Sequence, residues 1–423
     1  ALQIQSNHIQ MSYYFMFVIL FFVGAYFEDA YKKKELPHFF KASGVLALAA
    51  VVGVCINISN LYHTYEYSKE TMRGKSELKQ EGAAASQTSS GLDRDYITNW
   101  SYGIGETLTL LVPNVKGGGS GSTMSQSEVA MAKANPMYNG IYSQLPQYFG
   151  EQPWTAGPVY VGAFVMFLFV LGCFIVKGPL KWALLGATIF SILLSWGKNF
   201  MGLTDFFIDY VPMYNKFRAV SSILVIAEFT IPLLAIFALK EILSKPDMLK
   251  QEKNCRGVIA ALVLTAGVAL ILAVAPGTFF SSFITAQEMT ALKQALPAEH
   301  LAPFVANLTE MREAIIASDA WRSFFIIVIG CLFLFLYQLR KLKASFTLAG
   351  IALLCLIDMW SVNKRYLNDE QFVPKSKRSE AFVKTQADEI ILQDTTPNYR
   401  VLNFIGFPGN TFNENNTAYW HKS

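Results

Sequence analysis

Eight long blocks of apolar residues set the first limit on how this chain can fold. Each block is about 15 to 21 residues long, and about 20 helical residues at a rise of 1.5 Å cross the ~30 Å hydrocarbon core of a membrane. Six of the eight contain no Asp, Glu, Lys or Arg. We therefore predict an all-α, polytopic membrane protein with about eight transmembrane helices. The predicted spans are 11–27, 42–61, 157–176, 182–196, 219–239, 257–275, 323–339 and 344–362.

The composition agrees with this interpretation. Charged residues make up 16% of the chain and hydrophobic residues 52%, whereas about 25% of a soluble domain is charged. The alternative, a set of helices buried in a large soluble core, requires amphipathic helices to cover them, and few such segments are present. We assign residues 1–362 to a transmembrane domain.

Positive charge is concentrated in alternate linkers. Lysine and arginine cluster in the linkers 28–41, 177–181, 240–256 and 340–343, and by the positive-inside rule these linkers are cytoplasmic. The connections 62–156, 197–218 and 276–322 then lie outside, together with both ends of the chain. The net charge of +4 is mostly a topology signal, and we expect no nucleic-acid partner.

The two ends of the sequence suggest a fragment of a longer polypeptide. The chain opens at Ala1 with a polar decapeptide, and an outside N-terminus that leads into a span predicts that earlier spans precede it. Residues 363–423 are predicted to be the start of a truncated external C-terminal domain, with a strand at 399–405. Four of the five cysteines lie inside predicted spans, so no disulfide framework is expected.

The predicted external segments differ in character. Within the loop 62–156, the low-complexity stretches 82–91 and 117–122 are predicted to be flexible inserts, and residues 92–102 and 106–113 to be ordered against the membrane. The segment 203–214 is too short and too polar to span, so we expect it in the membrane interface. Helical patterns at 286–295 and 303–317 predict an external helical hairpin within 276–322.

Several basic residues lie on the predicted outer side, against the usual bias. They are Lys69, Arg73, Lys75 and Lys79 after the second span, and Lys198, Lys216 and Arg218 around the fourth and fifth. An anionic ligand at the membrane surface, such as a lipid phosphate, would account for them, because arginine offers a fork of donors and lysine a point charge. Ordinary solvated charge is the alternative, since four glutamates are interleaved with the first group.

Two acidic features could carry chemistry. Asp93 and Asp95 are separated by one residue, a spacing that can hold a divalent cation or supply a general base, although acidic turn residues after a glycine-rich stretch are the simpler interpretation. Glu228 is the only carboxylate deep inside a predicted span. An ionisable group there is a functional candidate by default, and the alternative is a hydrogen-bonded packing residue. Asp358 lies near the outer end of its span. The dispersed histidines predict no metal site.

Eight short strings resemble the YfhO family of bacterial membrane proteins, with the closest likeness to members from Bacteroidetes. The likeness extends over nearly the whole chain. The strings are NHIQMSYY at 7–14, YSKETMRG at 67–74, LDRDY at 92–96, WSYG at 100–103, YFGEQP at 148–153, GPVYVG at 157–162, KFR at 216–218 and NKRYL at 363–367.

This resemblance implies a C-type glycosyltransferase in the bacterial inner membrane. Such an enzyme takes a sugar from a polyprenyl-phosphate donor and transfers it to an external acceptor, here a cell-envelope glycan or lipid. In such enzymes the acidic catalytic residue usually lies in the first external loop, upstream of this fragment. The alternative is a multispanning transporter or lipid flippase that uses Glu228 as a coupling group.

On the transferase interpretation, three groups of residues receive expected roles. Asp93 and Asp95 are secondary catalytic candidates, with no certain cofactor but a possible divalent cation. Donor phosphate binding is assigned to Arg73, Lys75, Lys198 and Arg218, which are expected to converge on one groove. The substrate-facing loop is expected to contribute Tyr96, Trp100, Glu106, Glu151 and Gln152.

Overall fold

The computed structural model describes residues 1–423 except 75–90, 246, 378–381, 397, 405–414 and 422–423. It separates into two compact units, Ala1–Val362 and Asn363–Ser423. Both units consist of helices and loops, and the described residues form no strand beyond an isolated bridge between Thr123 and Pro146. The all-α fold class is therefore confirmed.

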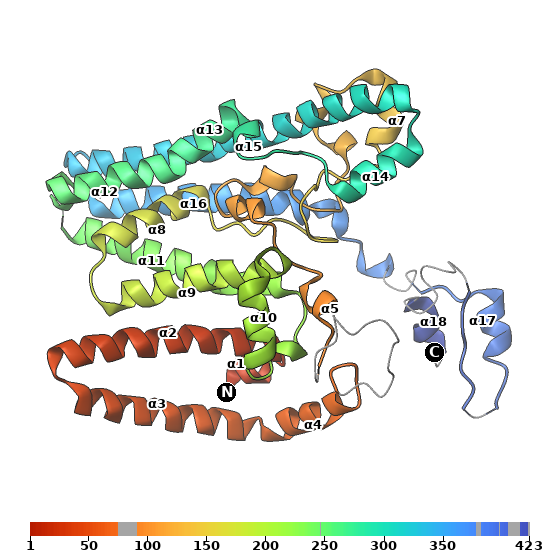
Figure 1. Ribbon diagram of the computed structural model, residues 1–423, viewed down its shortest axis with the longest axis horizontal. Helices are drawn as coiled ribbons and strands as arrows, with labels where there is room; N and C mark the ends of the chain where they lie inside the picture. Colours follow the sequence, from red (N-terminus) through yellow and green to blue (C-terminus); the bar gives the residue numbers. More distant parts are fainter. Residues whose placement is uncertain (75–90, 246, 378–381, 397, 405–414, 422–423) are drawn as a thin grey trace. The chain divides into compact units, whose positions relative to one another are not determined.

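The first unit begins with a pair of antiparallel helices (Figure 1). After the short α1 (Leu2–Gln5), α2 (Ile9–Lys33) ends at Lys34, whose backbone is left-handed, and α3 (Leu36–Ile56) returns beside it. The helix α4 (Ile58–Lys69) continues from α3. Only Gly53 of α3 is buried, so almost all of its apolar surface is available to lipid.

The remaining long helices form the main helical body. α8 (Ala163–Ile175) packs on α11 (Val225–Ser244), and α9 (Pro179–Ser195) lies between α11 and α2. On the other side of α8 lie α12 (Glu252–Leu262), a π-helical turn at Val263–Gly267, α13 (Val268–Val274), α15 (Ala298–Gln338) and α16 (Ala344–Tyr366). These helices run roughly alongside one another (Figure 1).

Six helices of the described chain are long and apolar enough to cross a membrane, or seven if a bent pair counts as one span. Every predicted span overlaps a helix, but two of these helices do not pass as single straight spans. α8 has 13 residues, fewer than predicted, because 157–162 are not helical. α9 has 17 residues and is followed by a turn of 108° into the segment Gly197–Tyr210. The structure therefore supports a multispanning helical architecture, and the count of eight remains a prediction.

The helix α10 (Met201–Tyr210) occupies most of the segment predicted to lie in the membrane interface. It runs across the direction of the neighbouring helices after the 108° bend (Figure 1). That orientation agrees with a segment that does not cross the bilayer.

The predicted helical hairpin differs from the observed one in its second arm. Its first arm is α14 (Ala286–Ala295), but the second arm and the following predicted span form one helix, the 41-residue α15. A buried face runs through both parts, from Phe304 and Leu308 to Ile327 and Leu334. Because this face keeps helical spacing throughout, nothing interrupts the helix where the sequence suggested a boundary.

The glycine-rich stretch 117–122 was predicted to be a flexible insert, and for its first residues this prediction was wrong. Gly117 has a φ of +81°, and a Cβ there would come within 1.9 Å of the Gln147 carbonyl oxygen. Ser120 N–H donates to the Thr155 carbonyl. Gly117 therefore serves close backbone packing and not flexibility. Of the other stretch, 82–91, only Gly91 is described.

The second unit contains α17 (Gln386–Ile391) and α18 (Asn415–Trp420). Thr385 and Asp388 form a capping box on α17, and His421 contacts Asp388 at 2.9 Å. The predicted strand at 399–405 does not form over its described residues 399–404.

Labelling of single cysteines tests the predicted sidedness. In a background with the five native cysteines changed to serine, we expect a membrane-impermeant maleimide to modify Ser143→Cys and Ser281→Cys in intact cells, because both positions are exposed in segments predicted to lie outside. Lys33→Cys and Lys250→Cys, exposed at the opposite end, should react only after permeabilisation. The reverse pattern would place every candidate site residue in the cytoplasm.

Candidate functional site

An exposed arginine lies between two aromatic side chains at one end of the helical body. Arg218 Nη1 donates to Tyr96 Oη at 2.6 Å, and its guanidinium carbon lies 5.4 Å from the Tyr96 ring centroid and 5.8 Å from that of Trp100. Tyr96 belongs to the short helix α5 (Arg94–Thr98), and Trp100 follows four residues later. That spacing lets both rings face the same cation.

The backbone on both sides of Arg218 is also fixed. Its carbonyl accepts from Gln10 Nε2 at 2.7 Å, which connects it to the start of α2. Ser221 N–H donates to the Trp100 carbonyl at 3.1 Å. The backbone around Arg218 is therefore held in place by hydrogen bonds, whereas its side chain remains exposed.

A second arginine contacts the same segment through a backbone carbonyl, while the predicted common groove stays a prediction. Arg73 Nε donates to the Lys216 carbonyl at 2.9 Å, and Lys216 Nζ donates to the Arg73 carbonyl at 2.7 Å. Partial burial lowers the pKa of Lys216. Arg73 thus contacts the chain two residues before Arg218, whereas Lys75 lies outside the described residues.

The neighbouring acidic residues do not neutralise this group. Asp205 and Asp209 of α10 bind Arg94, at 2.5 and 2.6 Å. Within the part of the chain that the structure describes, the side chains of Arg73, Lys198, Lys216 and Arg218 form no ion pair with a carboxylate. We call these four residues the basic corner.

The candidate carboxylates Asp93 and Asp95 lie at the start of α5. Both are exposed, and Asp93 is the N-cap residue without a side-chain capping bond. The described residues contain no group of three or more His, Cys, Asp or Glu side chains that could hold a metal ion. The pair is therefore accessible and close in sequence to Tyr96.

Glu106 is expected to face a substrate, but it is buried, with 2% of its surface exposed. Its carboxylate accepts from Tyr148 Oη at 2.6 Å and from the backbone N–H groups of Gly103 at 2.6 Å and Glu151 at 3.2 Å. Burial, followed by the nearby Glu106 charge, raises the pKa of Tyr148 well above its ordinary value, so the phenol stays protonated and donates. Glu106 consequently joins two loop segments instead of lining an open surface.

A second carboxylate lies beside Glu106. A Cβ on Gly103 would be 2.9 Å from Glu106 Oε2 and 3.0 Å from Glu151 Oε1, so both carboxylates lie close to the same glycine. Glu151 is exposed, and Gln152 N–H donates to Tyr148 Oη at 2.9 Å. Of the two acids, Glu151 is the one that a ligand can reach.

Lys116 was not identified from the sequence and lies under the same loop. Its Nζ is 4.2 Å from the Phe280 ring centroid and 5.0 Å from that of Phe149. Burial lowers its pKa, while the charges of Glu106 and Glu151 act in the opposite direction. The space bordered by Glu106 and Lys116 is about 10 Å³, which holds about one water molecule.

Hydrogen bonds connect the basic corner with this acidic group. Lys198 Nζ donates to the Glu151 carbonyl at 3.4 Å, and its backbone N–H donates to Ser101 Oγ at 2.8 Å. Trp100 Nε1 donates to the Trp154 carbonyl at 2.9 Å. The basic corner and Glu151 are therefore parts of one continuous surface.

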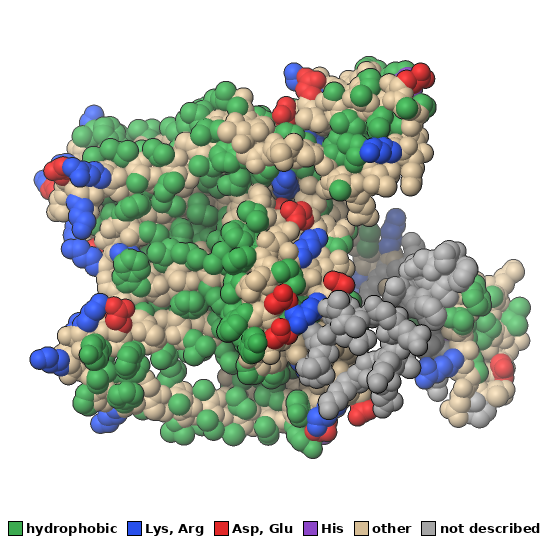
Figure 2. Space-filling model, in the orientation of Figure 1, with side chains coloured by type: hydrophobic (Ala, Val, Ile, Leu, Met, Phe, Trp, Pro, Cys, Tyr) green, Lys and Arg blue, Asp and Glu red, His purple; other side chains and the backbone are tan. Residues whose placement is uncertain are grey.

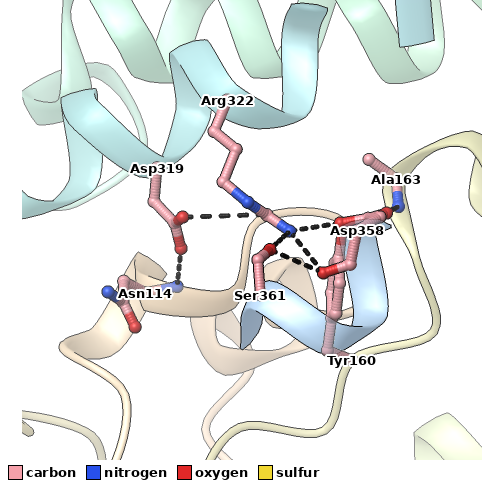
Figure 3. Close-up of polar contacts among 7 residues, drawn as sticks. All are labelled: Asn114, Tyr160, Ala163, Asp319, Arg322, Asp358 and Ser361. Carbon is pink, nitrogen blue, oxygen red and sulfur yellow. Dashed lines mark hydrogen bonds and ion pairs between the residues drawn. The ribbon is translucent and has the colours of Figure 1, made fainter. Parts of the chain in front are cut away.

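An ion pair between α15 and α16 lies among buried polar groups (Figure 3). Asp358 was placed near the outer end of its span by the sequence, yet it is 1% exposed and binds Arg322 of α15. Its carboxylate also accepts from Tyr160 Oη at 2.8 Å and from the Ala163 backbone at 3.0 Å. Burial favours pairing with a cation over contact with water.

The same arginine reaches a second acid. Arg322 Nη1 lies 3.7 Å from Asp319 Oδ1, and Asp319 Oδ2 accepts from the Asn114 backbone at 2.9 Å. Arg312, fully buried, binds both oxygens of Glu288 at 2.7 Å and the Phe283 carbonyl at 2.6 Å. The only sequence signal for these ion pairs was the presence of charged residues at the border of an apolar block. The sequence did not show which acid each arginine binds, because Asp358 and Glu288 are distant in the sequence from Arg322 and Arg312.

Glu228 lies in the helical segment Val220–Ser244, which is long and apolar enough to cross a membrane. The α-helical part of its span begins only at Val225, after a 3-10 turn at Val220–Leu224. Glu228 is therefore in the first turn of α11 and is exposed on the protein surface. A carboxylate is favourable at a helix N-terminus.

Comparison with known proteins provides no family for this chain. No protein-family model, no curated protein and no solved structure matches it. The argument for a function therefore depends on the residues of the site.

Removing the buried carboxylate tests this ion pair. We expect Asp358→Asn to destabilise the protein by about 3 kcal/mol, because Arg322 then loses its closer counter-charge and keeps only Asp319, at 3.7 Å. Unfolding in detergent, followed by circular dichroism, would measure the change. Glu252→Gln, which removes an exposed partner of Arg256, should leave stability unchanged.

The paired replacement Arg322→Met with Asp358→Leu should recover much of that loss, because neither charge then remains buried. A single Asp358→Asn variant as stable as Glu252→Gln would contradict this role of the ion pair.

Proposed function

We propose that this chain is an integral membrane glycosyltransferase-like protein that uses a polyprenyl-phosphate sugar donor. The observation that carries the proposal is the basic corner, where four cations without carboxylate partners among the described residues lie beside exposed aromatic and acidic side chains. The likeness of the short sequence strings to the YfhO family supports the same function.

A lipid phosphate fits the basic corner chemically. Arg218 uses Nη1 for Tyr96, and its guanidinium keeps further N–H groups for a bidentate contact with phosphate oxygens. Arg73 and Lys216 add charge next to it, and Lys198 adds charge on the Glu151 side. A phosphate leaving group would be stabilised as its negative charge develops.

The proposed reaction is a displacement at the anomeric carbon of the sugar. An acceptor hydroxyl forms the new carbon–oxygen bond, the bond to the phosphate oxygen breaks, and a carboxylate takes the hydroxyl proton. Asp93, Asp95 and Glu151 are the exposed carboxylates near the corner.

The membrane setting completes the proposal. The protein is placed in the bacterial inner membrane with eight spans, counting α8 and α9, and with both ends of this fragment outside. Residues 363–423 would then begin an external domain, and the acceptor would be a cell-envelope glycan or lipid. The concentration of positive charge in the linkers at the other end of the helices supports this orientation.

Arg218 provides the direct test of donor binding. We expect Arg218→Ala to weaken binding of a fluorescent short-chain polyprenyl phosphate about tenfold or more, since a charged hydrogen bond contributes about 1.5 to 3 kcal/mol. Arg218→Lys should recover only part of the loss, because the planar fork is absent. Fluorescence anisotropy of the detergent-purified chain measures both.

The matched control is Arg256→Ala, which removes an exposed arginine at the opposite end of the helices. It should bind the probe as the unmodified chain does. Equal affinity in Arg218→Ala and Arg256→Ala would refute the donor site.

Glu228 separates the transferase from an ion-coupled transporter. We expect Glu228→Gln to leave polyprenyl phosphate binding and sugar transfer within about twofold of the original, because the side chain lies in the first turn of α11 and outside the basic corner. Transfer of radiolabelled sugar in membranes is the measurement. Complete loss of transfer with normal folding would favour a coupling role for Glu228.

A further inference from the structure

A cavity of about 420 Å³ lies between α8, α12 and α15, at the end of the helices away from the basic corner. Leu171, Val258, Cys331 and Leu334 are among the apolar side chains that form its wall, and Lys250 lies at its border. The volume falls within the range of about 300 to 1,000 Å³ that small-molecule sites occupy. Nothing in the proposed sugar transfer uses this cavity.

One polar side chain is built into the apolar wall. Gln338 lines the cavity with only 8% of its surface exposed, and neither Oε1 nor Nε2 has a hydrogen-bond partner among the described residues. The adjacent Tyr337 is satisfied, because its hydroxyl donates to the Leu243 carbonyl at 2.7 Å. A buried amide without partners is costly, so the position of Gln338 points to a ligand that supplies them.

Water is a poor candidate for that ligand. A buried water needs two to four polar partners, and apart from Gln338 and Lys250 the cavity wall consists of apolar side chains and two cysteines. An apolar chain with a hydrogen-bonding group near one end matches both the wall and the amide.

The cavity mouth carries an excess of positive charge. Lys250 and Arg340 share one acid, Asp247, at 2.7 and 3.1 Å, so this group retains one net positive charge. Lysine and arginine side chains also gather at the end of the helical body where α12 begins and α15 ends (Figure 2). Basic sites between helices at a membrane surface favour anionic lipid head groups.

We propose that this cavity binds one acyl chain of an anionic phospholipid. The chain occupies the apolar space, an ester carbonyl accepts from Gln338 Nε2, and a head-group hydroxyl donates to Gln338 Oε1. The phosphate then lies near Lys250. This site is independent of the proposed sugar transfer.

Photolabelling of the full chain tests the site. The probe is phosphatidylglycerol with a diazirine in its acyl chain, and the labelled peptides are identified by mass spectrometry. Labelling is expected on the α12 and α15 segments that contain Val258 and Leu334. Gln338→Leu should lower this labelling about tenfold through loss of the hydrogen bonds, and Val258→Trp should abolish it by filling the cavity.

Gln251→Leu is the matched control, because it makes the same chemical change at an exposed glutamine of the same end that does not line the cavity. It should be labelled as strongly as the original chain. Undiminished labelling of Gln338→Leu or Val258→Trp would overturn the proposal. Equal labelling by a phosphatidylcholine probe would overturn its choice of an anionic head group.

A measurement on the unaltered chain does not depend on how the variants fold. Phosphatidylglycerol in mixed micelles should slow alkylation of Cys331, which lines the cavity, by an apolar maleimide. Cys55, exposed on α3, should react at the same rate with and without the lipid. Absence of protection at Cys331 would also overturn the proposal.

Discussion

The buried pair of Arg322 and Asp358 joins more of this protein than any of its exposed ion pairs could. Its two charges come from α15 and α16, and Asp358 also holds the first amide of α8 through Ala163. Asp319 extends the network to the Asn114 backbone in the loop 62–156. Charges removed from water are tolerated when each has its partner, so these four segments must keep one relative arrangement.

The cations near the loop end differ in their partners. Arg312 and Lys116 lie 4.8 and 5.0 Å from the ring centroid of Phe149, and Arg312 is neutralised by Glu288. Arg94 pairs with Asp205 and Asp209, whereas Arg73 and Arg218 have no carboxylate partner among the described residues. The guanidinium groups of these two arginines therefore keep N–H donors for an anion.

Hydropathy was sufficient to predict the helices, since each predicted apolar block became one. It could not predict where α8 begins, because the bond from Ala163 to Asp358 joins residues 195 positions apart. Composition suggested a flexible insert at 117–122, and it could not reveal that Gln147 approaches Gly117 too closely for a side chain. The sequence assigned Arg218 to donor binding and Tyr96 to the substrate-facing loop, but it did not predict their hydrogen bond. Nor did it predict the pairing of Arg94 with Asp205 and Asp209, because several acids were equally available.

The distribution of polar groups along the helices separates the two functions considered. An ion-coupled transporter places ionisable groups near the membrane centre, at the meeting point of its helices. Here α9 and α11 meet through Thr188 and Thr230, whose hydroxyl oxygens lie 2.7 Å apart, so that one hydroxyl donates to the other and the second donates to a carbonyl of its own helix. Glu228 lies outside that contact, in the first turn of α11. Between α9 and α11 the polar groups bind one another. At the loop end, in contrast, Arg73 and Arg218 have no carboxylate partner among the described residues. This contrast favours chemistry at one surface over passage of a substrate through the helical body.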